Sequence, residues 1–259
     1  MIQVDHVYKK YGESTVLDDV SFSVMKGECF GIIGPNGSGK STLLKQLSAV
    51  ERADSGVVQL DGKPVEQHTR RSLAQWLAVL QQESLPPIGF SVREVVEMGR
   101  FPFQNWLGGE KLDVDALIDS IIDKLGLAEL QHRSLDQLSG GERQRAALGK
   151  TMAQQPKLLM LDEPTTYLDI GHQIQLMEQI RAWQKEANMT VIAVLHDLNL
   201  ASLYCDRILM LNKGKVVSIG TPQQILNSEL IRDVYGITPI VVDHPVNGTP
   251  QIILQSNIL

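Results

Sequence analysis

The chain reads Gly34-Pro35-Asn36-Gly37-Ser38-Gly39-Lys40-Ser41-Thr42 directly after the apolar run Glu28–Ile33 and before the helix-like run LLKQLSAV. This stretch matches G-x-x-x-x-G-K-[ST] at every fixed position. Its glycines let the backbone curl so that successive N–H groups point inward at phosphate oxygens, and a helix starting near Lys40 adds its positive dipole end. In such a loop Lys40 reaches the β- and γ-phosphates, and Ser41 offers its hydroxyl to Mg²⁺. The strand and helix on either side favour a nucleotide phosphate site over a glycine-rich turn that binds nothing.

Two acidic residues far along the chain form a second candidate half of the site. The apolar run Leu158–Leu161 ends in Asp162 and Glu163. A carboxylate at a strand tip beside a phosphate loop can hold Mg²⁺ directly or through water, and we assign this role to Asp162. Glu163 is then placed to orient or deprotonate the attacking water. Two acids after a strand are common loop residues, so the prediction depends on their pairing with the phosphate loop.

Strand-like and helix-like runs alternate over most of the chain. From residue 91 to about residue 150 the apolar spacing is mainly helical, in SVREVVEMGR, DVDALIDSIIDKLG and GERQRAALGKTMA. The alternation predicts a parallel sheet covered by helices, with a helical lobe inserted into it. The further predicted strands are Gln3–Tyr8, Val16–Val24, Val57–Leu60, Leu77–Leu80, Thr190–Leu195, Arg207–Leu211 and Val216–Ile219.

The composition limits the classes of protein to which this chain can belong. The 259 residues carry 24 Lys and Arg against 30 Asp and Glu, a net charge of −6, which does not favour nucleic acid as a partner. No apolar run approaches the roughly 20 residues of a membrane-spanning helix, and the first residues do not look like a secretory signal. Cys29 and Cys205 cannot build a disulfide framework, which favours a reducing cytoplasm. We expect Cys29 to fill space in a buried strand and Cys205 to lie on a helix face. We expect the remaining histidines to be surface or packing residues: His6, His68, His132, His172 and His244.

The segment Leu138-Ser139-Gly140-Gly141-Glu142-Arg143-Gln144 precedes the acidic strand. It resembles the signature of ATP-binding cassette (ABC) proteins, and the resemblance covers Ile2–Gly236 with the family's motifs in order. Ser139-x-x-Glu142 is also a capping box at a helix start. Ser139, Gly140 and Gly141 then present bare N–H groups to an anion. The resemblance implies that this anion is the ATP of a second copy, so that two chains pair head to tail around two ATP molecules.

The same resemblance implies roles for single residues elsewhere. Tyr11 would stack on adenine, with an ordinary exposed loop tyrosine as the alternative. His196 would sense the γ-phosphate, with a core histidine as the alternative. Gln82 would be the Q-loop glutamine that couples γ-phosphate and Mg²⁺ to the helical lobe, and Gln81 competes for that role. Leu168-Asp169 would end the D-loop.

The implied fold is an α/β P-loop NTPase (RecA-like) core with an antiparallel β subdomain and an inserted helical lobe. The whole chain, 1–259, would be a single ABC ATPase domain. Residues 1–83 and 151–236 would form the core with its β subdomain, and residues 84–150 would form the helical lobe with the signature. Residues 237–259 would be a C-terminal extension without an assigned role.

Three longer stretches resemble the ATPases of bacterial importers for ferric siderophores, haem or cobalamin, and the siderophore group matches best at Thr165–Asp169. They are VREVVEMGR, PTTYLDIGHQIQLMEQI and VLHDLNLASLYCDRILMLNKGKVVSIGTP. The resemblance implies two peripheral ATPase copies at the cytoplasmic face of the membrane, under a permease dimer fed by an extracytoplasmic binding protein. Residues Gln82–Arg100 are the candidate permease contact, with ordinary packing as the alternative. A haem or cobalamin importer, an exporter and a soluble ABC ATPase, for example in iron–sulfur assembly, remain alternative functions.

Overall fold

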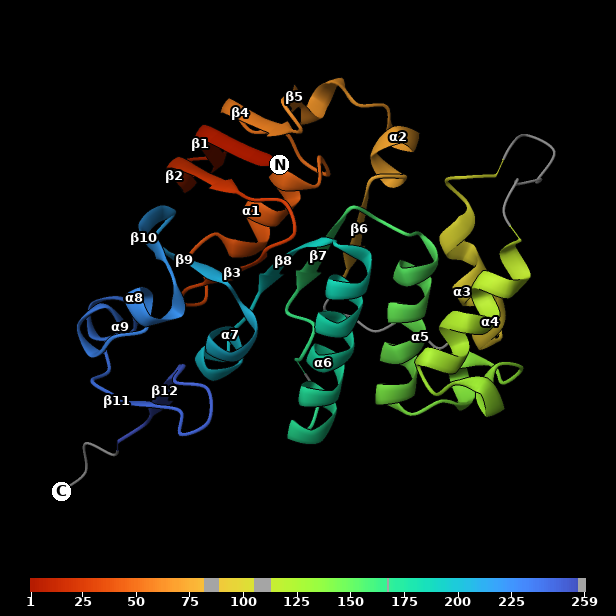
Figure 1. The fold of residues 1–259 in the computed structure, drawn as a ribbon. Coiled ribbons are helices and arrows are strands. Elements are labelled where there is room, and N and C mark those ends of the chain that lie inside the picture. The colour runs from red at the N-terminus through yellow and green to blue at the C-terminus, as the bar shows by residue number, and fades with distance from the viewer. Residues whose placement is uncertain (82–88, 105–112, 167, 256–259) are drawn as a thin grey trace. The chain divides into compact units, whose positions relative to one another are not determined.

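The computed structural model describes residues 1–81, 89–104, 113–166 and 168–255. The chain divides into two compact units, which we describe separately (Figure 1). The first unit joins Met1–His68 with Thr190–Leu259, and the second is Thr69–Met189. The boundaries of these units differ from the domain boundaries expected from the sequence. The expected domain boundaries stay predictions.

The first unit contains a four-stranded antiparallel sheet in the order β2-β1-β4-β5. Side chains alternate between buried and exposed along β2, as expected for strands with one face on a core. A hairpin follows β4, because Leu60 pairs with Lys63 across the turn Asp61-Gly62, where both residues have positive φ. The strands are β1 (Ile2–Tyr11), β2 (Ser14–Val24), β4 (Ser55–Leu60) and β5 (Lys63–Pro64).

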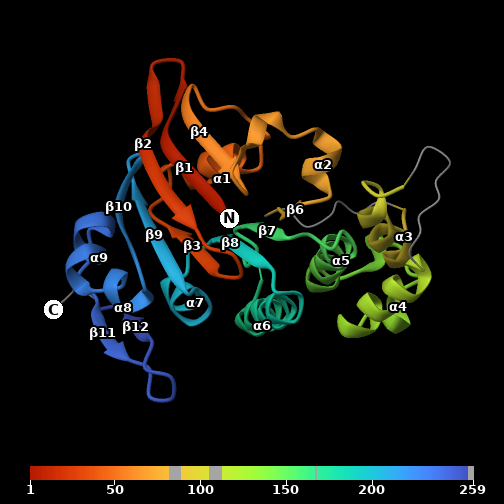
Figure 2. The same cartoon turned by 45° about the horizontal axis from the view of Figure 1, so that its top comes forward.

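A parallel group of strands forms the centre of the first unit (Figure 2). β3 (Cys29–Ile33) lies between β8 (Thr190–Val194) and β9 (Arg207–Asn212) and pairs with both in parallel; β10 (Lys215–Gly220) runs antiparallel to β9. Every residue of β3 and β8 is buried, the pattern of strands covered on both faces. The helices of this unit are α1 (Lys40–Leu47), α7 (Leu198–Tyr204), α8 (Pro222–Ile225) and α9 (Ser228–Tyr235), with the short turn η1 (Val65–Gln67).

The second unit holds the parallel pair β6 (Leu77–Leu80) and β7 (Leu158–Asp162) with a group of helices. The three predicted helical runs form α3 (Val92–Glu97), α4 (Val114–Lys124) and α5 (Gly140–Ala153), which pack against one another. At Gly149 a methyl group would lie 2.9 Å from Val96 Cγ2, so glycine allows α5 to approach α3 closely. The remaining elements are α2 (Arg70–Ala74), α6 (Ile170–Ala187), η2 (Met98–Arg100), η3 (Ala128–Leu130) and η4 (Leu135–Gln137).

A hairpin of β11 (Ile240–Asp243) and β12 (Pro250–Ile253) follows α9 in the C-terminal extension. It docks on α7 through side chains that bond to its backbone. Ser202 Oγ donates to the Pro250 carbonyl at 2.6 Å, and Asn199 accepts from the Ile252 N–H at 2.7 Å. The described part of the extension, up to residue 255, therefore packs within the first unit. Among the helices of the described residues, none is both long and apolar enough to cross a membrane.

Candidate active site

The loop after β3 is shaped for phosphate. It leads into α1, whose N-cap is Gly39 with φ of 105° and which has no side-chain cap. A Cβ at Gly39 would lie 2.7 Å from the Val16 carbonyl oxygen, and one at Gly34 would lie 2.1 Å from the Leu211 carbonyl oxygen. Only glycine fits these two positions. A helix N-terminus that no side chain caps is suited to an anionic ligand.

Two polar side chains inside this loop are also suited to an anionic ligand. Lys40 is 5% exposed, and its Nζ donates to the carbonyls of Gly34 at 2.9 Å and Pro35 at 3.0 Å, so the loop itself positions the ammonium group. The Ser38 Oγ is buried without a hydrogen-bond partner among the described residues. Buried polar groups normally have partners, and a phosphate oxygen would accept from this hydroxyl. The residues present therefore fit a nucleoside triphosphate.

Strand register brings His196 to the same edge of the sheet as the phosphate loop. Ile32 of β3 pairs with Val194 of β8, and the Leu195 N–H donates to the Ile32 carbonyl at 3.2 Å. Gly34 and His196 each follow two residues later, so they leave the carboxyl ends of neighbouring parallel strands, where ligands collect in such sheets. His196 is exposed, as a group that contacts a ligand must be.

Tyr11, at the end of β1, lies close to the last residue of the phosphate loop. Its hydroxyl donates to Glu51. The bond to Glu51 is the largest of the effects that raise the pKa of Tyr11, whereas a bond with the Thr42 side chain lowers it. The tyrosine is 45% exposed. The structure thus brings Tyr11 to the phosphate loop with part of its surface open, which is compatible with stacking on a base.

The acidic pair lies in the second unit, where Asp162 ends β7 and Glu163 follows it. Leu80 of β6 pairs with Leu161 of β7, so Gln81 and Asp162 leave the same edge of this parallel pair. Glu163 has φ of 50°, a left-handed conformation that costs a non-glycine residue about 1–3 kcal/mol and is often found at functional sites. Gln81 is exposed, and Gln82 lies outside the described residues.

The signature segment starts α5 as predicted. Ser139 is the N-cap, Glu142 N–H donates to Ser139 Oγ at 3.3 Å, and Glu142 Oε2 accepts from the Ser139 N–H at 2.7 Å. Hydrogen bonds to the Glu142 carboxylate from the Ser139 N–H, the larger effect, and from the Ser139 side chain lower the pKa of Glu142. A Cβ at Gly140 would meet nothing within 4 Å, so this glycine leaves its backbone open to a ligand. The capping box is confirmed as local structure.

The structure also shows contacts that the sequence analysis missed. The buried Gln144 of α5 donates from Nε2 to the Pro164 carbonyl at 3.2 Å, just after the acidic pair. Gln173 of α6 donates to the carbonyls of Thr165 at 3.3 Å and Leu168 at 2.9 Å. The place of Gln144 inside the signature segment was the one feature of the sequence that could have indicated its contact. Nothing in the sequence around Gln173 indicated a contact with this loop.

Comparison with known proteins shows the family to which this chain belongs. The family model described as ABC transporter matches residues 17–166, more than half of the chain. The chain belongs to the ABC transporter family. It is an ATP-binding subunit that hydrolyses ATP.

Two curated relatives are similar over nearly their whole length. The ferric enterobactin transport ATP-binding protein FepC of Escherichia coli (strain K12) is 38% identical over 94% of this chain and 90% of its own. The hemin import ATP-binding protein HmuV of Pseudomonas fluorescens (strain Pf0-1) is 41% identical over 98% of this chain and 100% of its own.

Solved structures of ABC cassettes have the same fold. A metal-chelate type ABC transporter in an inward-facing conformation matches with a TM-score of 0.84 at 25% identity, over 99% of this chain and 98% of that one. The dimeric structure of the bacterial ABC transporter cassette MJ0796 matches with a TM-score of 0.74 at 27% identity, over 85% of this chain and 98% of that one. The P-loop NTPase fold expected from the sequence is confirmed.

Proposed function

We propose that this chain is the ATPase subunit of an ABC importer for an iron(III)–siderophore complex, working under a separate membrane permease. The observation that carries the ATPase part is the phosphate loop, with its internally held Lys40 and a helix start that no side chain caps. The cargo is supported by the similarity to a ferric enterobactin transport protein and to a metal-chelate type transporter.

In the proposed site, residues 34–42 hold the triphosphate and Tyr11 stacks on the adenine. Ser41 and Asp162, joined by Gln82, form a hydroxyl, carboxylate and amide donor set suited to Mg²⁺, which commonly binds through one or two carboxylates plus substrate phosphates. When bound, the ion neutralises charge that develops on the phosphates. No three His, Cys, Asp or Glu side chains in the part of the chain that is described gather to hold a metal by themselves.

Glu163 orients the attacking water and accepts its proton, while His196 hydrogen-bonds the γ-phosphate. Positioning and charge neutralisation account for most of the acceleration of phosphoryl transfer, so the base needs correct placement more than a shifted pKa. The strained backbone at Glu163 supports a site held in one geometry for this purpose.

We infer that the functional unit contains two copies of the chain, each completing the other's site with its signature segment. The exposed Ser139 and Gly140 present the start of α5 to the γ-phosphate bound by the partner copy. A two-fold arrangement of this kind is closed, as in most homodimers. ATP binds the closed state better because only that state supplies the partner's N–H groups, and hydrolysis removes the advantage.

Import of haem is the second candidate, because the hemin import relative is the more identical of the two compared over the full chain. Uptake by a strain lacking this gene distinguishes the cargoes, with a ferric siderophore, haem or cobalamin supplied separately and the Glu163→Gln gene as the inactive control. We expect loss of ferric-siderophore uptake alone. Loss confined to haem or to cobalamin would replace the proposed cargo, and no loss with any of them would remove the importer assignment.

We propose that the chain is a peripheral protein at the cytoplasmic face of the membrane, held there by the permease through residues 82–100. Residues 82–88 of this segment lie outside the described part, whereas Phe90 is described and 45% exposed. Cell fractionation tests the placement. The chain should sediment with membranes when the permease is present and stay in the supernatant when the permease gene is deleted; sedimentation that does not depend on the permease would contradict the placement.

A further inference from the structure

His172, near the start of α6, lies between two segments of the proposed site in the second unit. On one side it bonds to Asp169, the N-cap of α6: Asp169 Oδ1 accepts from the His172 N–H at 2.9 Å, and Asp169 Oδ2 lies 2.8 Å from His172 Nδ1. These bonds lower the pKa of the Asp169 carboxyl. Asp169 is therefore the acceptor, and His172 Nδ1 carries the donated proton.

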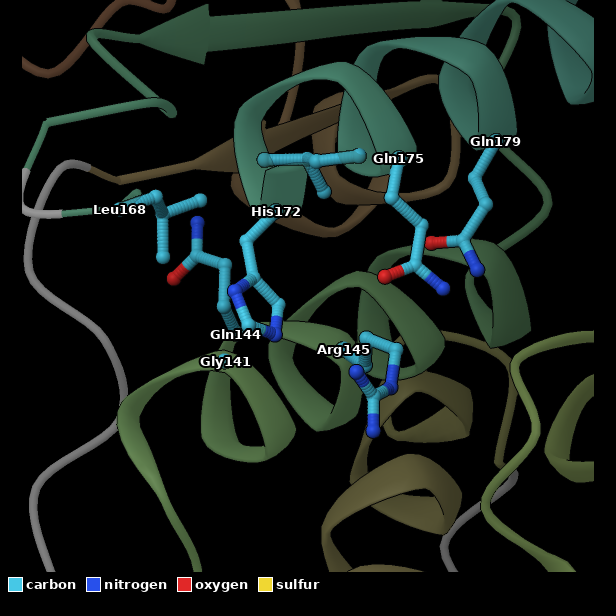
Figure 3. Close-up of a pocket in the computed structure, with 8 residues that line it drawn as sticks. Gly141, Gln144, Arg145, Leu168, His172, Gln175 and Gln179 are labelled. Carbon is cyan, nitrogen blue, oxygen red and sulfur yellow. The ribbon is translucent and has the colours of Figure 1, made fainter. Parts of the chain in front are cut away.

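On its other side the same ring rests against the signature segment. A Cβ at Gly141 would lie 3.0 Å from His172 Cδ2 and 3.2 Å from His172 Nε2, so the imidazole lies against the bare backbone of this glycine. Figure 3 shows His172 projecting from α6 toward α5 at Gly141, beside Leu168 and Gln144. Glycine at position 141 is what lets the ring approach this closely.

Further bonds fix the same loop between β7 and α6. Gln144, from the signature helix, holds the Pro164 carbonyl at the start of the loop. Gln173, next to His172, holds the Leu168 carbonyl near its end. His172 adds the link from the last residue of the loop, Asp169, to Gly141.

We propose that His172 is a positioning residue that fixes Gly141 and Asp169 in one geometry, so that the signature and the end of the loop reach the partner copy's nucleotide together. The inference rests on the proposed function, in which the signature acts on a second chain. His172 touches neither nucleotide nor water in this proposal. Its loss should therefore weaken closure of the dimer and leave nucleotide binding by the single chain unchanged.

The test compares His172→Ala with Gln175→Ala, both made in the Glu163→Gln chain. Gln175 lines the same pocket from the same helix and takes no part in the bonds just described. Light scattering gives the dimer dissociation constant with ATP, and a fluorescent ATP analogue gives the affinity of the monomer. We expect His172→Ala to weaken ATP-dependent dimerisation at least about tenfold with monomer affinity unchanged within about twofold, and Gln175→Ala to change neither.

A second variant distinguishes a role of His172 in positioning Gly141 from a role in stabilising the start of α6 alone. Asn at position 172 can still donate to Asp169 but lacks the ring atoms that meet Gly141, so we expect His172→Asn to keep the thermal stability of the parent and to dimerise as poorly as His172→Ala. Full recovery of dimerisation in His172→Asn would overturn the proposal, because capping of α6 would then suffice. Equal dimerisation in His172→Ala and Gln175→Ala, or loss of monomer ATP affinity in His172→Ala, would overturn it as well.

Different outcomes would contradict the proposed two-copy function and the proposed role of His172. If the Glu163→Gln parent stays monomeric with ATP, the proposed two-copy function fails, and the inference about His172 falls with it. If the parent dimerises and the His172 variants dimerise equally well, only the inference about His172 fails.

Discussion

At the scale of single residues, Lys40 is the side chain that binds phosphate in the proposed site. We predict that Lys40→Ala weakens ATP affinity by about 10- to 100-fold, since a hydrogen bond to a charged group contributes about 1.5–3 kcal/mol. Equilibrium titration with a fluorescent ATP analogue measures the change. Lys45→Ala is the matched control, because Lys45 lies on the same helix and pairs with Glu51 on the surface. Equal affinity in the two variants would contradict the assignment of the loop.

In the proposed function, Glu163 is the base for the hydrolysis step. We predict that Glu163→Gln binds ATP normally and turns over about 10²- to 10⁴-fold more slowly, the usual contribution of a general base. The amide keeps the size of the side chain but cannot accept the proton of the water. Phosphate release at saturating ATP measures the rate, and hydrolysis at the normal rate would remove Glu163 from this role.

The phosphate loop could be predicted from the sequence because all of its chemistry lies within nine consecutive residues, and the structure supports its geometry at Gly39 and Lys40. His172 could not. Its bond to Asp169 is local, but its contact with Gly141 comes from the packing of α6 on α5, which no local pattern encodes. We expected His172 to be a surface or packing residue. The left-handed backbone at Glu163 was equally hidden, since glutamate rarely adopts it.

At the scale of elements, the start of α5 depends on the charge of Glu142. Its pKa is lowered by the bonds to Ser139, so this carboxylate stabilises the helix start fully above its ordinary pKa of 4.5, and the contribution is lost as pH falls through the lowered folded value. We predict that wild type and Glu142→Gln differ most in unfolding free energy near neutral pH and converge as pH falls through the lowered folded pKa of Glu142. Urea unfolding at several pH values measures this, and a difference that grows with acid would contradict it.

α9 places Tyr235 beside the phosphate loop. Its hydroxyl is buried without a partner in hydrogen-bond geometry among the described residues, and burial raises the pKa of Tyr235 to about 12, against the opposing effect of the nearby Gly34 N–H. Because the neutral form is favoured, stability from this packing is present below pH 10 and lost as pH rises toward 12. Alkaline titration at 295 nm should show a tyrosine titrating near pH 12 that is missing in Tyr235→Phe. An unchanged titration curve in that variant would contradict the burial.

Most strands and helices were predictable as elements, but their ends were less so. β6 spans Leu77–Leu80 as predicted, whereas β1 extends to Tyr11 because the turn to β2 lets Tyr11 pair with Ser14. The ends of a strand depend on its partner, and pairing is not visible within one segment of sequence. This extension matters, because it places Tyr11 beside the phosphate loop.

At the scale of the whole molecule, the residues of the proposed site fall in two separate compact units. The phosphate loop, Tyr11 and His196 belong to one unit, and Asp162, Glu163 and the signature belong to the other. The cargo could not be predicted from the chemistry of this chain, because in the proposed transporter the ATPase subunit does not contact it.

The most direct test is a structure of Glu163→Gln with ATP and Mg²⁺. The account predicts a two-fold dimer in which each ATP lies between the loop at residues 34–42 of one chain and Ser139, Gly140 and Gly141 of the other. ATP bound away from that loop, or bound there with no group from a second chain in contact, would contradict it.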